Sequence, residues 1–379
     1  MLSSPPILRL IALSVSSCLL AQSAWGIVRW NEGKDQVYVS ASVAVGVDSN
    51  IYAAATGGSD TTYSSSLGLE YRRHAGLIGV NASARLSMSE YSENTDESFR
   101  NPSLSLEFTK DTGRTTGTLG FAALRASRAD PAANARTDSW QYSSDFNFKY
   151  PLSERNSLSG GLAWSERQYQ GGNAALVDLT TLMASLDWFH VYTTERDLIA
   201  GYRIRLSETS DLTEFADHSF TVGVSGRIIP KLNGTARIGY QVRQGIGDTT
   251  ENFTGYNAAI SATWNLSKRI SLTGQILNDF STTSTNVTID ALAGTLDLQY
   301  AANARLALAA GVGGGINKFL GLEGEGRKDT FFNAYGRISY VFSERLRLGL
   351  TYAYFKNWST DSFSDFNRNS LTFEASSRF

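Results

Sequence analysis

Apolar and polar residues alternate along most of the chain, and the alternating stretches end at an aromatic residue just before a short polar turn. Seven stretches are followed by such a turn, and an eighth ends at the last residue. The aromatic residues at these ends are Tyr71, Phe108, Tyr150, Tyr192, Trp264, Tyr300, Phe342 and Phe379. Successive side chains of a β-strand point to opposite faces, so alternation of period two places the apolar residues on one face. An aromatic ring at the end of an apolar face is typical of a membrane–water boundary. The pattern predicts a transmembrane β-barrel with an aromatic girdle.

The polar turns recur at regular intervals of about 38 residues, which fits a unit of two strands, one short turn and one longer loop. They centre on His74, Gly113, Glu154, Glu195, Lys231, Lys268, Asn303 and Glu344. The longer connections are expected at 48–61, 89–99, 127–137, 169–177, 209–216, 245–254, 280–287, 317–328 and 358–367. We therefore predict an all-β, antiparallel, up-and-down barrel of about 18 strands, with 16 as the alternative. An even number returns both ends of the barrel to the periplasmic rim, where the short turns lie.

The N-terminal residues 1–26 have the form of a secretory signal peptide. Arg9 precedes an apolar core from Leu10 to Leu20, and small residues before position 27 predict cleavage after Gly26. The single cysteine, Cys18, stands in a Val-Ser-Ser-Cys sequence that would suit a lipoprotein, so lipidation is the alternative. Residues 27–36 are expected to be a short periplasmic segment, and residues 37–379 the barrel.

Composition narrows the function classes. Hydrophobic residues make up 42% of the chain, yet no apolar run beyond the N-terminus approaches the ~20 residues that a membrane helix needs. The net charge of −2 gives no reason to expect a nucleic-acid partner. The predicted short turns are basic and the longer loops acidic. Acidic loops would suit either solubility or divalent-cation bridges to lipopolysaccharide.

Arginine residues mark the face opposite the apolar one. By alternation, this inner face carries Arg203, Arg205, Arg227, Arg237, Arg243, Arg305, Arg337 and Arg347. Inward acids are fewer and include Glu70, Glu107, Asp145, Asp279, Asp297 and Glu374. So many charged groups cannot form a dry core, because each would need a buried partner. They predict a water-filled lumen. That lumen prefers anions weakly, unless the acids neutralise the arginines.

Catalytic and ligand-binding patterns are scarce. The three histidines are widely separated, and only Asp217 beside His218 could contribute to a hydrolase site at the outer rim. The glycine cluster from Gly311 to Gly315 lacks the spacing of a phosphate-binding loop, and small side chains on a strand explain it better. We expect no metal, no cofactor and no catalytic residue.

Residues 39–52, with the sequence VSASVAVGVDSNIY, resemble the opening of the "putative beta-barrel porin 2" family. Members are similar in a small-residue first strand, a Gly-x-Asp-Ser/Asp-Asn-Ile segment, and a series of hairpins up to a terminal Phe. Some members are encoded with exopolysaccharide systems. The resemblance therefore implies a passive pore for small solutes or for polysaccharide. It also implies that the terminal Phe is part of a signal for insertion.

These observations together predict an outer-membrane pore. The alternatives are a non-conducting structural or adhesive barrel and, more remotely, a barrel hydrolase. The expected partners are outer-membrane lipid, lipopolysaccharide, the barrel assembly machinery and polysaccharide export components.

Overall fold

The computed structural model describes residues 28–379 except 131–132, 134, 172–175, 250 and 322–325. The predicted signal peptide and Cys18 lie outside the described residues. The strands are β1 Val28–Trp30, β2 Asp35–Asp48, β3 Asp60–Arg73, β4 Gly79–Tyr91, β5 Phe99–Lys110, β6 Thr116–Asp130, β7 Ala135–Pro151, β8 Asn156–Gln170, β9 Leu179–Thr193, β10 Arg196–Thr209, β11 Glu214–Ile229, β12 Leu232–Ile246, β13 Asn252–Trp264, β14 Ile270–Thr282, β15 Thr288–Ala301, β16 Leu306–Leu320, β17 Lys328–Val341, β18 Leu346–Ser359 and β19 Phe366–Arg378. Three short 3₁₀ helices, η1 Asn31–Gly33, η2 Thr95–Glu97 and η3 Ser362–Ser364, lie among them.

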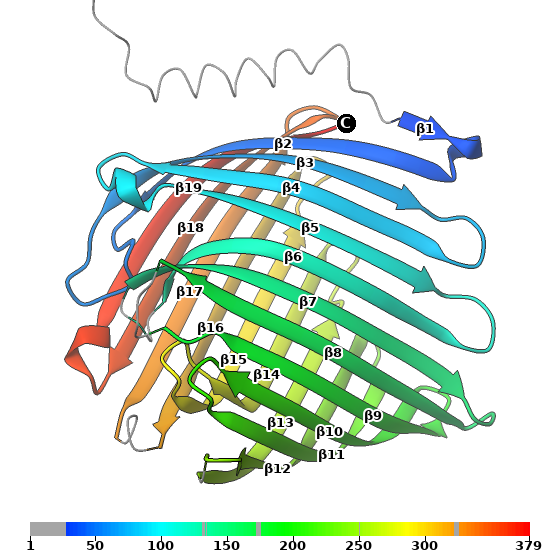
Figure 1. Ribbon diagram of the computed structural model, residues 1–379. Helices are drawn as coiled ribbons and strands as arrows, with labels where there is room; N and C mark the ends of the chain where they lie inside the picture. Colours follow the sequence, from blue (N-terminus) through cyan, green and yellow to red (C-terminus); the bar gives the residue numbers. More distant parts are fainter. Residues whose placement is uncertain (1–27, 131–132, 134, 172–175, 250, 322–325) are drawn as a thin grey trace, which may run out of the picture.

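Strands β2 to β19 form one closed antiparallel barrel (Figure 1). Each strand pairs with the next in the sequence, and β19 pairs with β2 from Ser370–Asp48 to Arg378–Ser40. The closing seam is extended by two backbone bonds between Val39 and Phe379. Closure leaves no barrel strand with an open edge along its whole length. The prediction of 18 strands is confirmed, and the alternative of 16 is wrong.

The two rims differ as predicted. The short turns lie at the top and on the right in Figure 1, on the same rim as the start of β2 and the end of β19, and the longer loops lie on the opposite rim, towards the lower left. Eight of the nine longer connections fall within their predicted ranges, and the one between β8 and β9 extends one residue further, to Asp178. The start of the first barrel strand differs from the prediction: β2 begins at Asp35 instead of Val37. Its first residues pair with β1. No helix in the described part of the chain has the length and apolar character to span a membrane.

The alternation of side chains produces two chemically different faces. On β12, Ile238 and Tyr240 are 61% and 49% exposed on the outer surface, whereas Gln241 and Arg243 are completely covered on the inner side. Large apolar residues are exposed in this way on nearly every strand. In a bilayer the hydrocarbon covers this surface, so exposed leucine and phenylalanine are stable there.

The wall splits between β13 and β14 in its loop-side half. Their ladder ends at the Ala258–Asn278 pair, although β13 extends to Asn252 and β14 to Thr282. Beyond the split, β14 stays paired with β15 as far as Thr282–Thr288. The end of the β14–β15 hairpin has therefore separated from β13.

Side-chain amides replace the missing backbone bonds at this split. The Tyr256 carbonyl accepts from the amides of Gln241 and Asn278, at 3.1 and 2.7 Å. The Asn257 amide donates to the Asn278 carbonyl at 3.0 Å. Buried backbone groups need such partners, so the amides stabilise the point at which the ladder stops.

A second split lies between β5 and β6. Their ladder ends at Ser103–Leu124, while β6 and β7 remain paired to Asp130–Ala135. The β6–β7 and β14–β15 hairpins are eight strands apart in a barrel of eighteen, so they come from nearly opposite parts of the wall.

Candidate functional site: the barrel lumen

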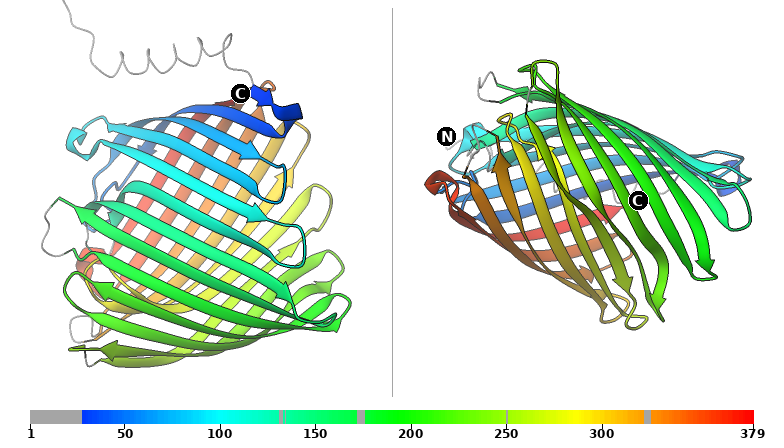
Figure 2. Two further views of the ribbon diagram at one scale, coloured as in Figure 1. Left: turned by 45° about the vertical axis from the view of Figure 1, so that its right-hand side comes forward. Right: turned by 90° about the horizontal axis from the view of Figure 1, so that it is seen from below.

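The end of the β14–β15 hairpin crosses the inside of the barrel. Asp279 on β14 accepts hydrogen bonds from Arg203 and Arg205 on β10, at 2.8 and 3.1 Å. Four strand intervals separate β10 from β14 along the wall, or about 19 Å at the usual spacing of about 4.8 Å. These contacts are possible only because the hairpin leans across β13, β12 and β11. The hairpin can be followed as the yellow segment in the right-hand view of Figure 2.

Arg243 on the inner face of β12 binds the hairpin to the wall. Its guanidinium donates to both oxygens of Asp217, at 2.7 and 3.2 Å, and to the Ser281 carbonyl at 3.1 Å. It also donates to the Thr288 hydroxyl on the other strand of the hairpin at 3.1 Å. Arg205 donates to the same Asp217 at 2.7 Å. Three arginines and two aspartates thus form one network, in which every carboxylate serves more than one guanidinium.

Phenylalanine side chains complete this contact. Phe280 would face the membrane in a regular wall, but it is 1% exposed because the hairpin presses it onto the inner face. Its ring lies 6.5 Å from that of Phe253, which lies 6.4 Å from Phe215. Arg243 lies over the Phe215 ring at 4.7 Å. Arg243 has no exposed surface, so the prediction that it lines an aqueous lumen is wrong; the hairpin covers it.

The β6–β7 hairpin also leans inward. Arg136, near its end, lies over the inward-facing rings of Tyr91 and Phe99 at 5.0 and 5.8 Å. The same guanidinium pairs with Glu97 at 3.1 Å and donates to the Ile51 carbonyl at 3.2 Å. One arginine therefore ties the hairpin to two loops at the mouth, those following β2 and β4.

Other predicted arginines are also paired. Arg237 donates to Asp187 at 2.7 Å, and Arg227 is bound to Glu195 near the turn rim. Arg305 lies in the β15–β16 turn, not on a strand, so its predicted position in the lumen wall is wrong. The alternation misplaced it because β16 begins at Leu306.

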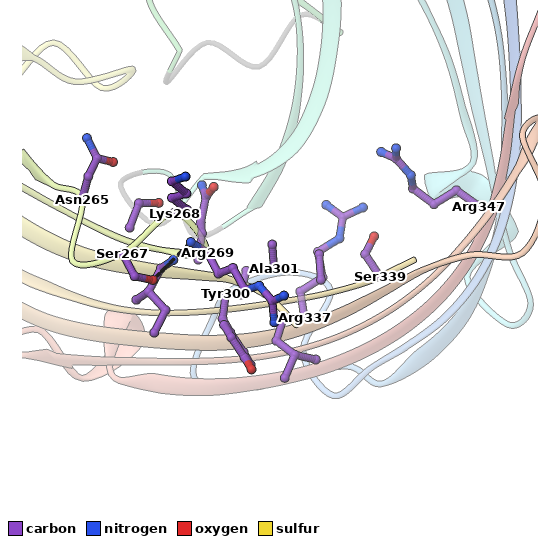
Figure 3. Close-up of a pocket in the computed structure, with 15 residues that line it drawn as sticks. Asn265, Ser267, Lys268, Arg269, Tyr300, Ala301, Arg337, Ser339 and Arg347 are labelled. Atoms are coloured by element: carbon purple, nitrogen blue, oxygen red, sulfur yellow. Dashed lines mark hydrogen bonds between the residues drawn. The ribbon is translucent and has the colours of Figure 1, made fainter. Parts of the chain in front are cut away.

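The wall that the β14–β15 hairpin leaves uncovered carries the less paired arginines. Arg85 on β4 and Arg347 on β18 are exposed and form no ion pair with any described residue. Arg337 is 3.5 Å from Glu374, with both side chains more than a third exposed. In Figure 3, Arg337 and Arg347 point away from the side to which Tyr300 points. Because Tyr300 belongs to the outer face, these arginines point into the lumen.

Two cavities near the turn rim share Arg347. One of about 480 Å³ also has Arg337, Lys268 and Arg269 in its lining. The other, of about 310 Å³, is lined by Arg85, Arg345 and Arg378 among others. Seven cationic residues line the two cavities together, against the two acids Glu344 and Glu374. This end of the lumen is positively charged.

The predicted girdle residues lie towards the turn rim. Tyr71, Phe108, Tyr150, Trp264 and Tyr300 stand on strands, and each is paired with a residue of the outer face. Tyr192 is 69% exposed at the end of β9, and Phe342 is 62% exposed in the turn after β17. Phe379 differs, because the residue is only 8% exposed, and its ring centroid lies 5.7 Å from the Arg345 guanidinium.

The sequence neighbours Asp217 and His218 do not form a site. Asp217 points inward to Arg205 and Arg243, whereas His218 lies on the outer face and contacts the Tyr202 hydroxyl at 2.8 Å. In the described part of the chain, no group of three or more His, Cys, Asp or Glu residues could hold a metal ion.

Comparison with known proteins supports the class of fold. Residues 219–379 match the family described as "putative beta-barrel porin 2". The resemblance predicted from residues 39–52 is confirmed, although by a different part of the chain. No curated protein sequence matches the chain.

Solved structures give the same fold at low sequence identity. OccK2 (OpdF) of Pseudomonas aeruginosa is 10% identical with a TM-score of 0.51, over 93% of this chain and 99% of that one. OpdK of the same organism, solved with vanillate, is 11% identical with a TM-score of 0.50, over 90% and 99%.

The closed 18-strand barrel and the charged lumen define an outer-membrane β-barrel of the porin type. Its place is the bacterial outer membrane, and the family that its C-terminal residues 219–379 match is "putative beta-barrel porin 2".

Proposed function

We propose that the protein is a passive outer-membrane pore for small solutes, with a weak preference for anions. The observation that carries the proposal is the positively charged end of the lumen around Arg85, Arg337 and Arg347. Fixed positive charge in a narrow aqueous passage raises the local concentration of anions.

The inward hairpins favour small solutes over a polymer. The β14–β15 hairpin covers the inner face of β10 to β13, and the β6–β7 hairpin leans in from the other side. Both reduce the cross-section on the loop side. A narrower passage suits single small solutes, and export of a branched polysaccharide would need it to be wider.

Only some of the arginines that alternation selects should contribute to the anion preference. Arg203, Arg205, Arg237 and Arg243 are held by Asp187, Asp217 and Asp279. Their field is therefore largely cancelled at the distance of a passing ion. Arg85 and Arg347 have no such acid, so they should dominate selectivity.

Reversal potentials in planar bilayers under a KCl gradient test the proposal. The parent should prefer chloride, and the double variant Arg85→Gln/Arg347→Gln should shift the reversal potential towards cations. The shift should shrink near 1 M salt, where the screening length is about 3 Å. Arg100→Gln is the matched control, because Arg100 pairs with Met88 on the outer face.

Two outcomes would contradict the proposal. A parent without measurable conductance would favour a structural or adhesive barrel. A conducting parent whose selectivity is unchanged in the double variant would mean that Glu374, Glu70 and their neighbours neutralise the arginines.

A further inference from the structure

Aromatic rings line the inner wall of β17 to β19. They lie nearer the loop rim than the positively charged end of the lumen does. Phe331, Phe355 and Phe366 form a row, with ring centroids 6.0 and 5.5 Å apart and planes inclined by 15° and 24°. Tyr335 is the next inward-facing aromatic residue along β17. Aromatic side chains are unusual on the watery side of a barrel wall, where polar residues are expected.

Glycines of β16 allow two of these rings to lie against the wall. A Cβ added to Gly311 would be 2.3 Å from a carbon of the Tyr335 ring, and one at Gly315 would be 2.6 Å from the Phe331 ring. The rings therefore occupy the space in which β16 would otherwise carry side chains. The Tyr335 hydroxyl donates to Asp297 on β15 at 2.7 Å, which holds its ring across the glycine. The glycine cluster thus makes room for an aromatic surface on the inner wall.

A cavity of about 530 Å³ lies at this surface. Tyr335 and Phe355 line it from the wall, and Ala53 from the β2–β3 loop and Ala129 near the end of β6 also border it. It therefore lies where the inward loop and hairpin approach the uncovered wall. Its volume is in the range of ordinary small-molecule sites, roughly 300–1,000 Å³.

The polar groups of the cavity are mostly uncharged. Asn333, Thr351 and Ser370 offer an amide and two hydroxyls. The one cation in the lining, Arg368, is bound by both oxygens of Asp48, so its charge is compensated. A carboxylate ligand would find no free cation here. A ligand with a flat apolar face and many hydroxyls would match both the rings and the uncharged donors.

We infer that this cavity binds the pyranose ring of an uncharged sugar, with the C–H face of the ring on Tyr335 and Phe355. The inference rests on the proposed pore and names the class of solute that this part of the lumen recognises. The hydroxyls of the sugar would bond to Asn333, Thr351 and Ser370. An acyclic polyol has no flat C–H face to stack on the rings, and its hydroxyls are not held in a fixed arrangement. It should therefore bind much less well.

The test measures binding of cellobiose to the detergent-solubilised protein by equilibrium dialysis, with block of the ion current in planar bilayers as the second readout. Tyr335→Ala and Phe355→Ala should each weaken cellobiose binding about tenfold, which corresponds to about 1.4 kcal/mol. Phe332→Ala and Tyr352→Ala are the matched controls, since both residues are on the same strands but face outward. Neither control should change binding.

A glycine variant tests the wall geometry. Gly311→Ala should weaken cellobiose binding because its Cβ would displace the Tyr335 ring, whereas Gly336→Ala, which meets nothing within 4 Å, should not. Absence of cellobiose binding to the parent, or equal binding in all variants, would overturn the inference. So would binding of benzoate but not cellobiose, or equal binding of sorbitol. An ion current without sugar binding would leave the pore standing, whereas sugar binding without any current would refute the pore alone.

Discussion

Asp217 is the residue whose loss should most clearly release the β14–β15 hairpin. It is 1% exposed and accepts from Arg205 and from two nitrogens of Arg243. The Asp217→Asn variant keeps the size of the side chain but removes its charge. Arg243, which has no exposed surface, would then be a buried cation without a compensating carboxylate.

The expected cost follows from that burial. Removing one partner of a buried ion pair costs about 3–5 kcal/mol. The barrel can avoid most of this cost if the hairpin moves away and water reaches Arg243. The docking equilibrium of the hairpin should therefore shift by about a hundredfold to a few thousandfold, since 1.4 kcal/mol corresponds to a factor of ten.

Hydrogen exchange and single-channel recording measure this change. Amides of residues 279–290 should exchange much faster in Asp217→Asn, and the mean conductance and current noise should rise. Asp187→Asn is the control, because Asp187 holds Arg237 on the same wall without a bond to the hairpin. If Asp217→Asn exchanges and conducts like the parent, the hairpin is not held by this network and the reasoning is wrong.

Three further predictions concern the mouth, the membrane face and assembly. Arg136→Ala should make the β2–β3 loop, residues 49–59, more sensitive to protease, because Arg136 joins Glu97 and the Ile51 carbonyl; Arg128→Ala, which lacks these bonds, should not. Leu296→Arg should lower the free energy of unfolding in lipid by about 2–4 kcal/mol, because Leu296 is 45% exposed on the outer face, whereas Thr295→Arg on the inner face should be tolerated in the same urea titration. Deletion of Phe379 should lower the amount of heat-modifiable barrel in outer-membrane fractions, because both backbone bonds to Val39 are lost; unchanged amounts would contradict a role of this residue in closure.

The barrel was predictable from the sequence because the pattern that specifies each strand and turn is local. The strands alternate with period two, and seven of the eight short turns follow an aromatic end, so strand number and rims could be counted from the sequence. Alternation also predicted the inner face for Arg237, Arg337 and Arg347; in the structure Arg237 donates to Asp187, and Arg337 and Arg347 point away from the side to which Tyr300 points. It failed at Arg305, where one residue separates the turn from the strand.

The inward hairpins were not predictable, because they depend on contacts between distant parts of the chain. Nothing near Asp279 in the sequence shows that its partners are Arg203 and Arg205 on β10. Phe280 offers little help, because alternation places it on the membrane side near the loop end of β14, where an apolar residue is expected. The aromatic surface was missed for a similar reason, since Gly311 and Tyr335 are adjacent only through strand pairing.

The point at which β13 and β14 separate has a mechanical consequence. The β14–β15 hairpin stays attached to the wall through β16 alone, and the amides of Asn257 and Asn278 satisfy the backbone where the other attachment ends. The hairpin is therefore hinged to the wall near Asn278. Its swing would break the side-chain bonds at the tip and loosen the pairing within the hairpin, without a change in the β13–β14 ladder from Trp264–Leu272 to Ala258–Asn278. The barrel could then change the width of its passage while the wall on the turn side stays completely closed.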